Sequence, residues 1–339
     1  MYLFKKQTWL TAGLLLTLTA CGGGSDTVVT TTATTSVDVF DGAAVGCSVS
    51  SDGTTATEVG DGAYTFATVL DAGTVVTATG CTDTNTQSSL PALSGVVQSG
   101  AVVISPITTL IVEAAIANDV VAKGIGLRTG AKSISATALQ AAIARIVANL
   151  KLRDYQPTDP ATANYIAAAK ADTTGTSTAT IAMRVSLAIS TLLKSIEVSA
   201  GPANASAAVA AFSQAIVNSS AVDLTKTTGV EAVMTEAKNL APPVVATAIQ
   251  TASDAIVTLA TLIINTTGDI TLAIEVTTII ADFLNTGDET AITNTTTITE
   301  LVTTVTLSCA LGTSFGTRRL QTIKHTINSI DSLNYGKNT

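Results

Sequence analysis

The chain has few of the residues on which most active sites depend. Its 339 residues include one histidine, one tryptophan and four cysteines. A single histidine excludes a zinc site built from several histidines. Aromatic residues make up only 4% of the chain, and the one tryptophan, Trp9, lies near the N-terminus. The chain therefore lacks the aromatic side chains that stack against sugars in carbohydrate-cleaving enzymes, which argues against a glycosidase.

Charge is also scarce, and it is mostly negative. Charged residues make up 12% of the chain, against about 25% in an ordinary soluble domain. The net charge of −8 argues against binding to nucleic acid and against attraction to anionic lipid. Apolar residues are plentiful, and the chain is long enough for roughly two domains with a buried core.

Motifs for catalysis are missing as well. The chain has no Gly-x-Ser-x-Gly turn that could supply a nucleophilic serine for its one histidine, His325. A Ser–His hydrolase is therefore excluded. Gly124-Ile125-Gly126 does not continue into the Gly-Lys-Ser/Thr of a phosphate-binding loop. The acidic residues of the second half are scattered, as helix capping and solubility would place them. We therefore expect a protein that is not an enzyme, with no catalytic residue, no metal and no cofactor.

The N-terminus has the pattern of a signal peptide. Lys5 and Lys6 precede a short apolar stretch, residues 9–19, and the small residues Thr19 and Ala20 follow. The apolar stretch is too short for a stable transmembrane helix. Residues 1–20 are therefore predicted to be a signal peptide that is removed on export.

The residues around the predicted cleavage site carry a resemblance. Leu18-Thr19-Ala20-Cys21 resembles the lipobox of bacterial lipoproteins. The resemblance implies diacylglyceryl transfer to the Cys21 sulfur, cleavage before Cys21 and acylation of the new N-terminus, with palmitate among the acyl chains. The alternative is an ordinary secreted protein cleaved after Ala20, in which Cys21 is incidental.

The segment after Cys21 suits a tether. Gly22-Gly23-Gly24-Ser25 is the kind of flexible linker expected after a lipid anchor, and we assign residues 21–36 to a lipidated tether. Gly22, where an aspartate would stand in a protein of the inner membrane, indicates the outer membrane by analogy with lipoproteins. We expect the chain to be anchored there through its lipid, on the surface or on the periplasmic face.

Export sets the expected chemistry of the other cysteines. Cys47 and Cys81 both lie in a strand-rich segment, and we expect them to form a disulfide in an oxidising compartment. Closing that loop would contribute about 3–4 kcal/mol on a chain-entropy argument. The alternative is two separately buried thiols. Cys309 is left over, either as a buried free thiol or as a partner in an intermolecular disulfide.

Residues 37–104 are predicted to form a small β-sandwich. Short runs rich in valine, tyrosine and phenylalanine alternate with turns that contain glycine, at intervals of about ten residues. The Asp-Gly pairs supply residues that tolerate a positive φ in hairpins. The turn signals are Asp41-Gly42, Ser51-Asp52-Gly53, Asp61-Gly62 and Ala72-Gly73.

The order of motifs in this region carries a second resemblance. The motifs are Asp41-Gly42-Ala43-Ala44-Val45-Gly46-Cys47, Asp61-Gly62-Ala63-Tyr64-Thr65-Phe66, Gly80-Cys81-Thr82-Asp83, Leu90-Pro91 and Ser105-Pro106-Ile107-Thr108-Thr109-Leu110. Their order is similar to that in uncharacterised bacterial outer-membrane lipoproteins, where a prealbumin-like or carboxypeptidase-regulatory-like β-sandwich precedes an Ala-rich helical domain. The resemblance covers roughly residues 37–150. It implies an α+β fold, with an Ig/prealbumin-like sandwich followed by an all-α bundle, and it implies no enzymatic activity.

Residues 105–310 are predicted to form the helical domain. Ser105-Pro106 is an N-cap followed by proline at the first helical position, and apolar residues then recur at helical spacing. The apolar run 255–264 is too short to span a bilayer, and we interpret it as part of a buried bundle helix. Further helices are expected at 135–150, 161–171, 177–198, 203–218, 230–240, 243–265, 270–285 and 290–310.

Two C-terminal features are left open by the sequence. Residues 270–310 are rich in Ile, Val and Thr, which favour strands, although their length and spacing favour helices. Residues 311–339 form a basic tail that includes Arg318 and Arg319. The tail is expected either to dock as a short helix or to be a flexible end.

One cluster of oxygen ligands is worth testing against the structure. Asp83-Thr84-Asn85 is the best local candidate for calcium, and hairpins could bring Asp52 and Asp61 close to it. Turn chemistry explains these residues equally well.

The leading functional hypothesis is a non-catalytic, lipid-anchored envelope protein with a structural, adhesive or assembly role through protein or glycan contacts. It would contact the membrane through its lipid and would not bind nucleic acid. The alternative is a protein that binds a small apolar ligand or lipid in a cavity of the helical domain. An enzyme without a recognisable motif is the third hypothesis.

Overall fold

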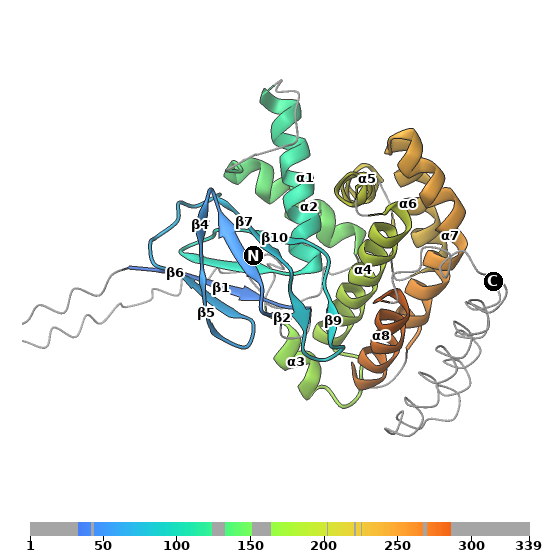
Figure 1. Ribbon diagram of the computed structural model, residues 1–339, viewed down its shortest axis with the longest axis horizontal. Coiled ribbons are helices and arrows are strands. Elements are labelled where there is room, and N and C mark those ends of the chain that lie inside the picture. The colour runs from blue at the N-terminus through green and yellow to red at the C-terminus, as the bar shows by residue number, and fades with distance from the viewer. Residues whose placement is uncertain are drawn as a thin grey trace, which may run out of the picture. The chain divides into compact units, whose positions relative to one another are not determined.

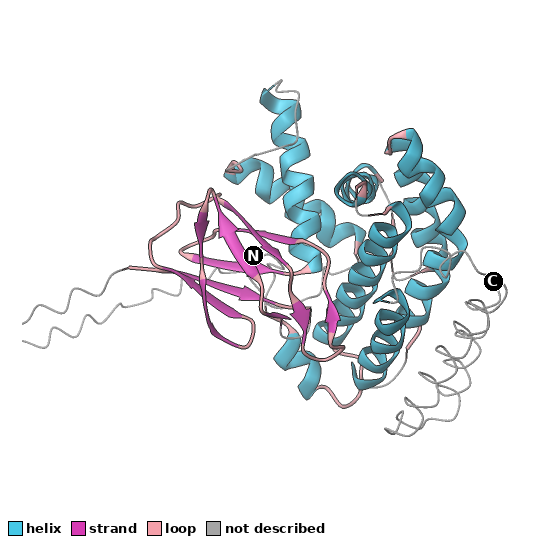
Figure 2. Ribbon diagram, in the orientation of Figure 1, coloured by secondary structure: helices cyan, strands magenta, loops and turns pink. Residues whose placement is uncertain are grey.

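The computed structural model shows an α+β fold in which strands come first and helices follow (Figure 2). The described strands and helices belong to one compact unit, which begins at Ala33. The structure describes residues 33–41, 44–123, 133–150, 164–201, 203–219, 222–224, 226–266 and 270–285. The predicted signal peptide, Cys21, most of the predicted tether, the predicted helix 290–310, Cys309 and the tail 311–339 lie outside these residues.

The strands of the described chain form three small sheets. Their orders are β11-β1-β6-β5, β10-β7-β3-β4 and β2-β8-β9. Neighbouring strands are antiparallel except for β1 and β11, which are parallel. The strands are β1 Thr35–Val39, β2 Ala44–Val45, β3 Ser48–Ser51, β4 Thr54–Thr55, β5 Thr57–Gly60, β6 Ala63–Phe66, β7 Val75–Thr79, β8 Thr82–Asp83, β9 Ser88–Ser89, β10 Leu93–Val96 and β11 Ala101–Ile104.

Alternation of apolar and polar residues gives these strands a buried face. In β1, Val37 and Val39 point into the core while Ser36 and Asp38 are exposed. Tyr64 and Phe66 of β6 are buried in the same cluster of side chains. The period of two that predicted strands in this region is therefore observed.

The first strand begins inside the range 21–36 that is predicted to be a tether. β1 begins at Thr35, and it pairs with β11 on one side and β6 on the other. The Thr35 side chain is fully buried, and its Oγ1 accepts a hydrogen bond of 2.8 Å from the Leu70 backbone N–H. Strand pairing and this hydrogen bond draw Thr35 and Ser36 into the sheet.

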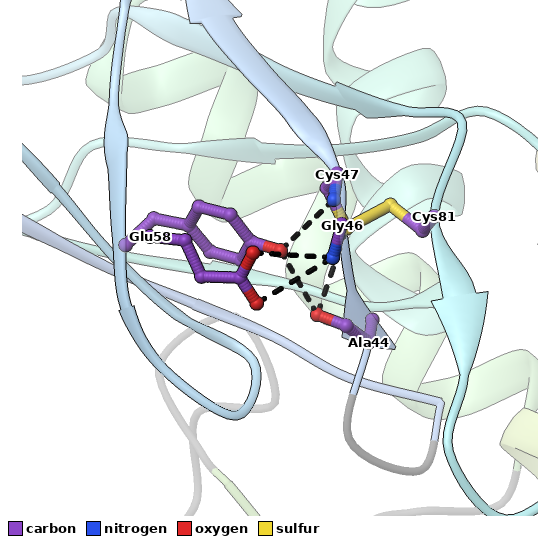
Figure 3. The surroundings of a disulfide bond; sticks show 6 residues. Ala44, Gly46, Cys47, Glu58 and Cys81 are labelled. Carbon is purple, nitrogen blue, oxygen red and sulfur yellow. Dashed lines mark hydrogen bonds between the residues drawn. A yellow bond between two sulfur atoms is a disulfide. The ribbon is translucent and has the colours of Figure 1, made fainter.

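The predicted disulfide is confirmed. Cys47, between β2 and β3, is bonded to Cys81, which directly precedes β8 (Figure 3). Tyr64 stabilises the same loop, because its hydroxyl donates to Ala44 O at 3.2 Å and accepts from the Cys47 N–H at 3.0 Å. The Glu58 carboxylate accepts a further hydrogen bond from the Gly46 N–H at 3.2 Å. Covalent and polar contacts therefore hold the β2–β3 connection in one conformation.

The helices match most of the predicted segments (Figure 1). Residues 270–285 are helical, which settles that part of the segment whose type the sequence left open. The third helix starts five residues later than predicted and the sixth starts three residues earlier. The helices are α1 Pro106–Lys123, α2 Ala136–Asn149, α3 Ile166–Ala171, α4 Thr178–Ala200, α5 Ala205–Asn218, α6 Thr227–Leu240, α7 Pro243–Ile264 and α8 Ile270–Asn285.

The start of α4 is fixed by one aspartate. Asp172 Oδ1 accepts from the Thr174 N–H, the Thr174 hydroxyl and the Gly175 N–H, and Oδ2 accepts from the Ser177 N–H and the Thr180 hydroxyl. These hydrogen bonds, those of Thr174 first, hold the pKa of Asp172 well below its usual value. Ser177 caps α4 itself, since its hydroxyl accepts from the Thr180 N–H.

Helix α4 lies at the centre of the helical core. It packs against α1, α3, α5, α7 and α8. The strands share this core, because Phe40, Val96 and Val103 are buried in the same cluster as the helices. Phe40 meets Tyr165, just before α3, edge to face with ring centroids 5.1 Å apart. The contacts of α1 with β10 and β11 extend the same interface.

Two helices of the described residues are long and apolar enough to cross a membrane, by length and composition alone. They differ in burial: 83% of the apolar window of α4 lies inside the structure, against 39% for α7. Burial of this kind makes α4 a core helix. The apolar run 255–264 is the second half of α7, so it belongs to a longer helix with one face that the described residues leave uncovered.

Gly95 in β10 offers a test of the packing between strands. A Cβ at this position would collide with Val103 O and approach the side chains of Val102 and Ile104 to 3.0 Å. We expect Gly95→Ala to destabilise the protein by about 1–3 kcal/mol, as overpacking does. Gly60→Ala is the control, because its Cβ would meet only the Ala63 Cβ at 3.9 Å. Urea denaturation compares the two variants, and equal midpoints would contradict this account of the packing.

Candidate functional site

Two aspartates are buried where the strands meet α4. Asp41 follows the end of β1, and Asp83 is the last residue of β8. Each side chain is only 2% exposed. The neighbouring Phe40 N–H donates to Ile104 O at 2.9 Å, which fixes the chain where it leaves the sheet. The pairing of the strands therefore places both carboxyl groups at the same small cavity. We call the place defined by Asp41 and Asp83 the junction site.

Local hydrogen bonds satisfy Asp83. Its Oδ1 accepts from the Asn85 N–H at 2.9 Å and from Asn85 Nδ2 at 3.3 Å, and its Oδ2 accepts from the Thr86 hydroxyl at 2.9 Å. Burial raises the pKa of Asp83, and these donors oppose the rise. Asp83, Asn85 and Thr86 therefore make the hydrogen bonds that are typical of a turn. Asp83 also lines the same small cavity as Asp41.

Asp41 is less well satisfied. The hydroxyls of Ser190 and Ser186 on α4 lie near enough to stabilise its carboxylate. Asp41 Oδ1 and Ser186 Oγ nevertheless both lack a hydrogen bond of acceptable geometry. Burial raises the pKa of Asp41 well above its ordinary value, the negative charge of Asp83 raises it further, and the two hydroxyls oppose these effects.

A cavity of about 30 Å³ adjoins the two carboxyl groups. Its lining includes the Ser190, Thr191 and Thr277 side chains of α4 and α8, together with Thr86 and Ser89 from the β8–β9 hairpin. This volume holds one water molecule or one ion. An organic substrate does not fit, so the junction site can hold a proton, a water molecule or a cation.

A second hollow lies between α6 and α7. It is an open groove of about 780 Å³, lined by residues of both helices. Met234, Ile249 and Val257 form its apolar floor. A groove of this volume is in the range of small-molecule sites.

Hydrogen bonds cross this groove in two places. Lys238 Nζ donates to Gln250 Oε1 at 2.8 Å, and the Thr261 hydroxyl donates to Thr227 Oγ1 at 3.4 Å. The threonines of α7 return their hydroxyls to the helix backbone, as Thr258 does to Asp254 O at 2.7 Å. The rim is thus polar but offers few free donors, so apolar contact dominates what the groove can supply.

The predicted site residues fall in different places. Cys47 and Cys81 form the disulfide, and Cys21 lies outside the described residues. No three His, Cys, Asp or Glu side chains gather within the described residues. Asp52 and Asp61 therefore do not complete a site with Asp83.

One part of the junction site is predictable from the sequence. The pattern Asp83-Thr84-Asn85 predicts an oxygen ligand at Asp83, whereas Asp41-Gly42 predicts only a turn and no motif points to the α4 hydroxyls. Asp41, Asp83 and Ser190 are far apart in the chain, and only the packing of α4 against the strands brings them together. The signal in the sequence for the α4 side of the site is a pair of serines, Ser186 and Ser190, on the apolar face of the helix predicted at 177–198.

Comparison of the chain with protein-family models, with curated proteins and with solved structures found no match. The functional argument therefore starts from the chain's own residues.

The pair of aspartates predicts an unusual pH dependence. In the unfolded chain aspartate ionises near pH 3.8, whereas folded Asp41 holds its proton to higher pH. In buffer with EDTA, the free energy of unfolding should therefore fall as pH rises from about 4.5 towards the raised pKa, and then level off. Asp41→Asn should remove most of this slope and be more stable than wild type at pH 7. We expect its midpoint of urea denaturation at pH 7 to lie above that of wild type, because the variant has no carboxylate charge to bury.

Denaturant unfolding at a series of pH values measures the slope. Asp61→Asn is the matched control, because Asp61 lies in an exposed turn. Equal slopes in wild type and Asp41→Asn would show that Asp41 ionises normally in the folded chain.

Proposed function

We propose that the protein is a non-catalytic, lipid-anchored protein of the bacterial cell envelope. The observation that carries the proposal is Leu18-Thr19-Ala20-Cys21, which ends a signal-peptide pattern and precedes a glycine-rich linker. The Cys47–Cys81 disulfide supports export, because such bonds persist in oxidising compartments. In this proposal, Cys21 carries diacylglycerol and an acyl chain such as palmitate, and the chain sits at the outer membrane.

The proposal includes the fold family and the division into domains. Residues 37–104 would act as an Ig/prealbumin-like sandwich, as in uncharacterised outer-membrane lipoproteins, and residues 105–310 as a helical bundle. The disulfide and the buried Tyr64 stabilise the first part. The helices of the second part pack around α4, in a core that also takes in Phe40, Val96 and Val103 of the strand region.

The chemistry of the described residues supports a role in contact and assembly. The junction site is too small for an organic substrate. The Asp172 carboxylate is occupied by its hydrogen bonds to the Ser177 N–H and the Thr180 hydroxyl at the start of α4. The groove has an apolar floor, and its lining includes two acidic side chains, Glu231 and Asp254. A structural, adhesive or assembly role through protein or glycan contacts fits such a surface.

Cys21→Ser tests the anchor. Cells that express wild type should incorporate labelled palmitate into the protein and retain it in the outer-membrane fraction, because two or more acyl chains give durable attachment. Cys21→Ser should lose both the label and the membrane fractionation. Cys309→Ser is the matched control and should behave as wild type. External protease then distinguishes the surface from the periplasmic face.

Label and fractionation that do not depend on Cys21 would refute the lipid anchor. The chain would then be a secreted or periplasmic protein cleaved after Ala20.

The groove between α6 and α7 favours a second candidate function. Its apolar floor and its volume of about 780 Å³ suit a small apolar ligand or a lipid chain. Among the described residues, only 39% of the apolar window of α7 is buried, and this exposure supports the same hypothesis. In this second proposal the helical part stores or carries an apolar ligand outside the cytoplasm.

Thr258→Trp tests this second function. The indole would fill the groove from its wall, and we expect the affinity for dansyl-labelled undecanoic acid to fall about tenfold, equivalent to about 1.4 kcal/mol. Thr247→Trp is the matched control: Thr247 is exposed on the same helix, outside the groove, and its hydroxyl bonds the backbone in the same way. Fluorescence titration of the Cys21→Ser form avoids competition from the protein's own acyl chains. No binding by the parent form, or equal binding by both tryptophan variants, would exclude the groove as a lipid site.

A further inference from the structure

We propose that the junction site binds one hard divalent cation of the calcium type, held by Asp41 and Asp83 against the hydroxyls of α4. This inference goes beyond the proposed envelope function and does not depend on it. It also replaces the expectation of a protein without metal.

The first observation is a set of unsatisfied oxygens. Asp41 Oδ1 and Ser186 Oγ are both buried and both lack a hydrogen-bond partner. They come from separate elements, the end of β1 and the middle of α4, and the Ser186 hydroxyl approaches the Asp41 carboxyl. Buried polar atoms without partners are costly, and each one calls for a ligand. A cation in the cavity would satisfy the Asp41 carboxylate, which lines it, and would leave the Ser186 hydroxyl free to donate to the same carboxyl group.

The second observation is the kind of atom that surrounds the cavity. Besides the two aspartates, the lining includes the hydroxyl-bearing residues Thr86, Ser89, Ser190, Thr191 and Thr277, together with the apolar residues Leu90, Pro91, Ala281 and Leu284. Calcium takes six to eight oxygen ligands in irregular geometry, whereas magnesium requires a near-ideal octahedron and keeps several waters. A cavity of about 30 Å³ has room for one ion with little water. Oxygen donors without room for a hydration shell favour calcium.

The third observation is uncompensated charge. Asp41 and Asp83 are both buried and line the same small cavity, which is unfavourable when both are ionised. Lys194 is the basic side chain among the described cavity-lining residues, but its Nζ lies 3.5 Å from Glu197 Oε2 and is already paired. A divalent cation would neutralise both carboxylates at neutral pH.

The site would join the two parts of the fold. Asp41 and Asp83 belong to the strands, and Ser186 and Ser190 belong to α4. A cation held between them would fasten the strands to the central helix. With only two carboxylates we expect weak binding, with a dissociation constant of about 10⁻⁴–10⁻³ M, as in extracellular calcium modules.

Direct binding to the mature-length chain tests the proposal. The Cys21→Ser form is stripped with EDTA, returned to EDTA-free buffer and titrated with calcium chloride by equilibrium dialysis with radioactive calcium. We expect about one bound calcium per chain and a rise in Tm of about 3 °C in ~10 mM calcium chloride. Magnesium chloride at the same ionic strength should raise Tm less.

Variants locate the ion. Asp41→Asn and Asp83→Asn should each abolish stoichiometric binding and the calcium-dependent rise in Tm. Asp61→Asn, which removes an exposed acidic charge, should keep both. Ser190→Ala removes one hydroxyl while leaving both charges, and it should weaken binding several-fold even where an aspartate variant fails to fold.

Absence of stoichiometric calcium binding by the parent form would overturn the proposal and leave a proton shared by the two aspartates. Unchanged binding in Asp41→Asn, or in Ser190→Ala together with Asp83→Asn, would overturn it as well. Neither result would bear on the lipid anchor, which is read from palmitate labelling at Cys21.

Discussion

Helix α4 packs against five other helices and also lies beneath the ends of the strands at Asp41. With 83% of its apolar window buried, it has almost no face left for solvent. Every element that touches α4 must therefore present a complementary surface. Its N-terminus is fixed by the hydrogen bonds of Asp172, so its position along the core is set at one end by polar contacts and along its length by packing.

The same helix carries a row of buried hydroxyl groups, which an ordinary core helix would avoid. Ser186, Ser190 and Ser195 are all buried, and Ser186 and Ser195 lack side-chain hydrogen-bond partners. In a low-dielectric interior such groups are costly unless they meet a polar partner. Ser186 and Ser190 both lie near the carboxyl of Asp41, which is itself poorly satisfied. Each polar group in this cluster therefore depends on the others, because any one of them would be costly to bury alone.

Much of the fold follows from local sequence patterns, whereas the junction site does not. Helical spacing predicted α1, α2, α4, α5 and α7 nearly to their ends, and glycine-containing turns predicted the strand region. The disulfide followed from compartment and proximity in a strand-rich segment. Local patterns predict the starts of α3 and α6 less accurately, because neither helix begins with a residue whose side chain caps it. Asp41 and Ser190 meet through packing between distant segments, and no local pattern encodes that meeting.

The place where the chain enters the fold bears on the proposed anchor. β1 is the first described element, and it lies between β11 and β6 with neighbours on both sides. A load applied through a lipid at Cys21 would reach β1 first, and the two ladders would share it along their length. β11 leads directly into α1, whose first residues pack on β10, so the same load passes on to the helices. A cation at Asp41, two residues beyond β1, would reinforce that path at the point where the strands meet α4.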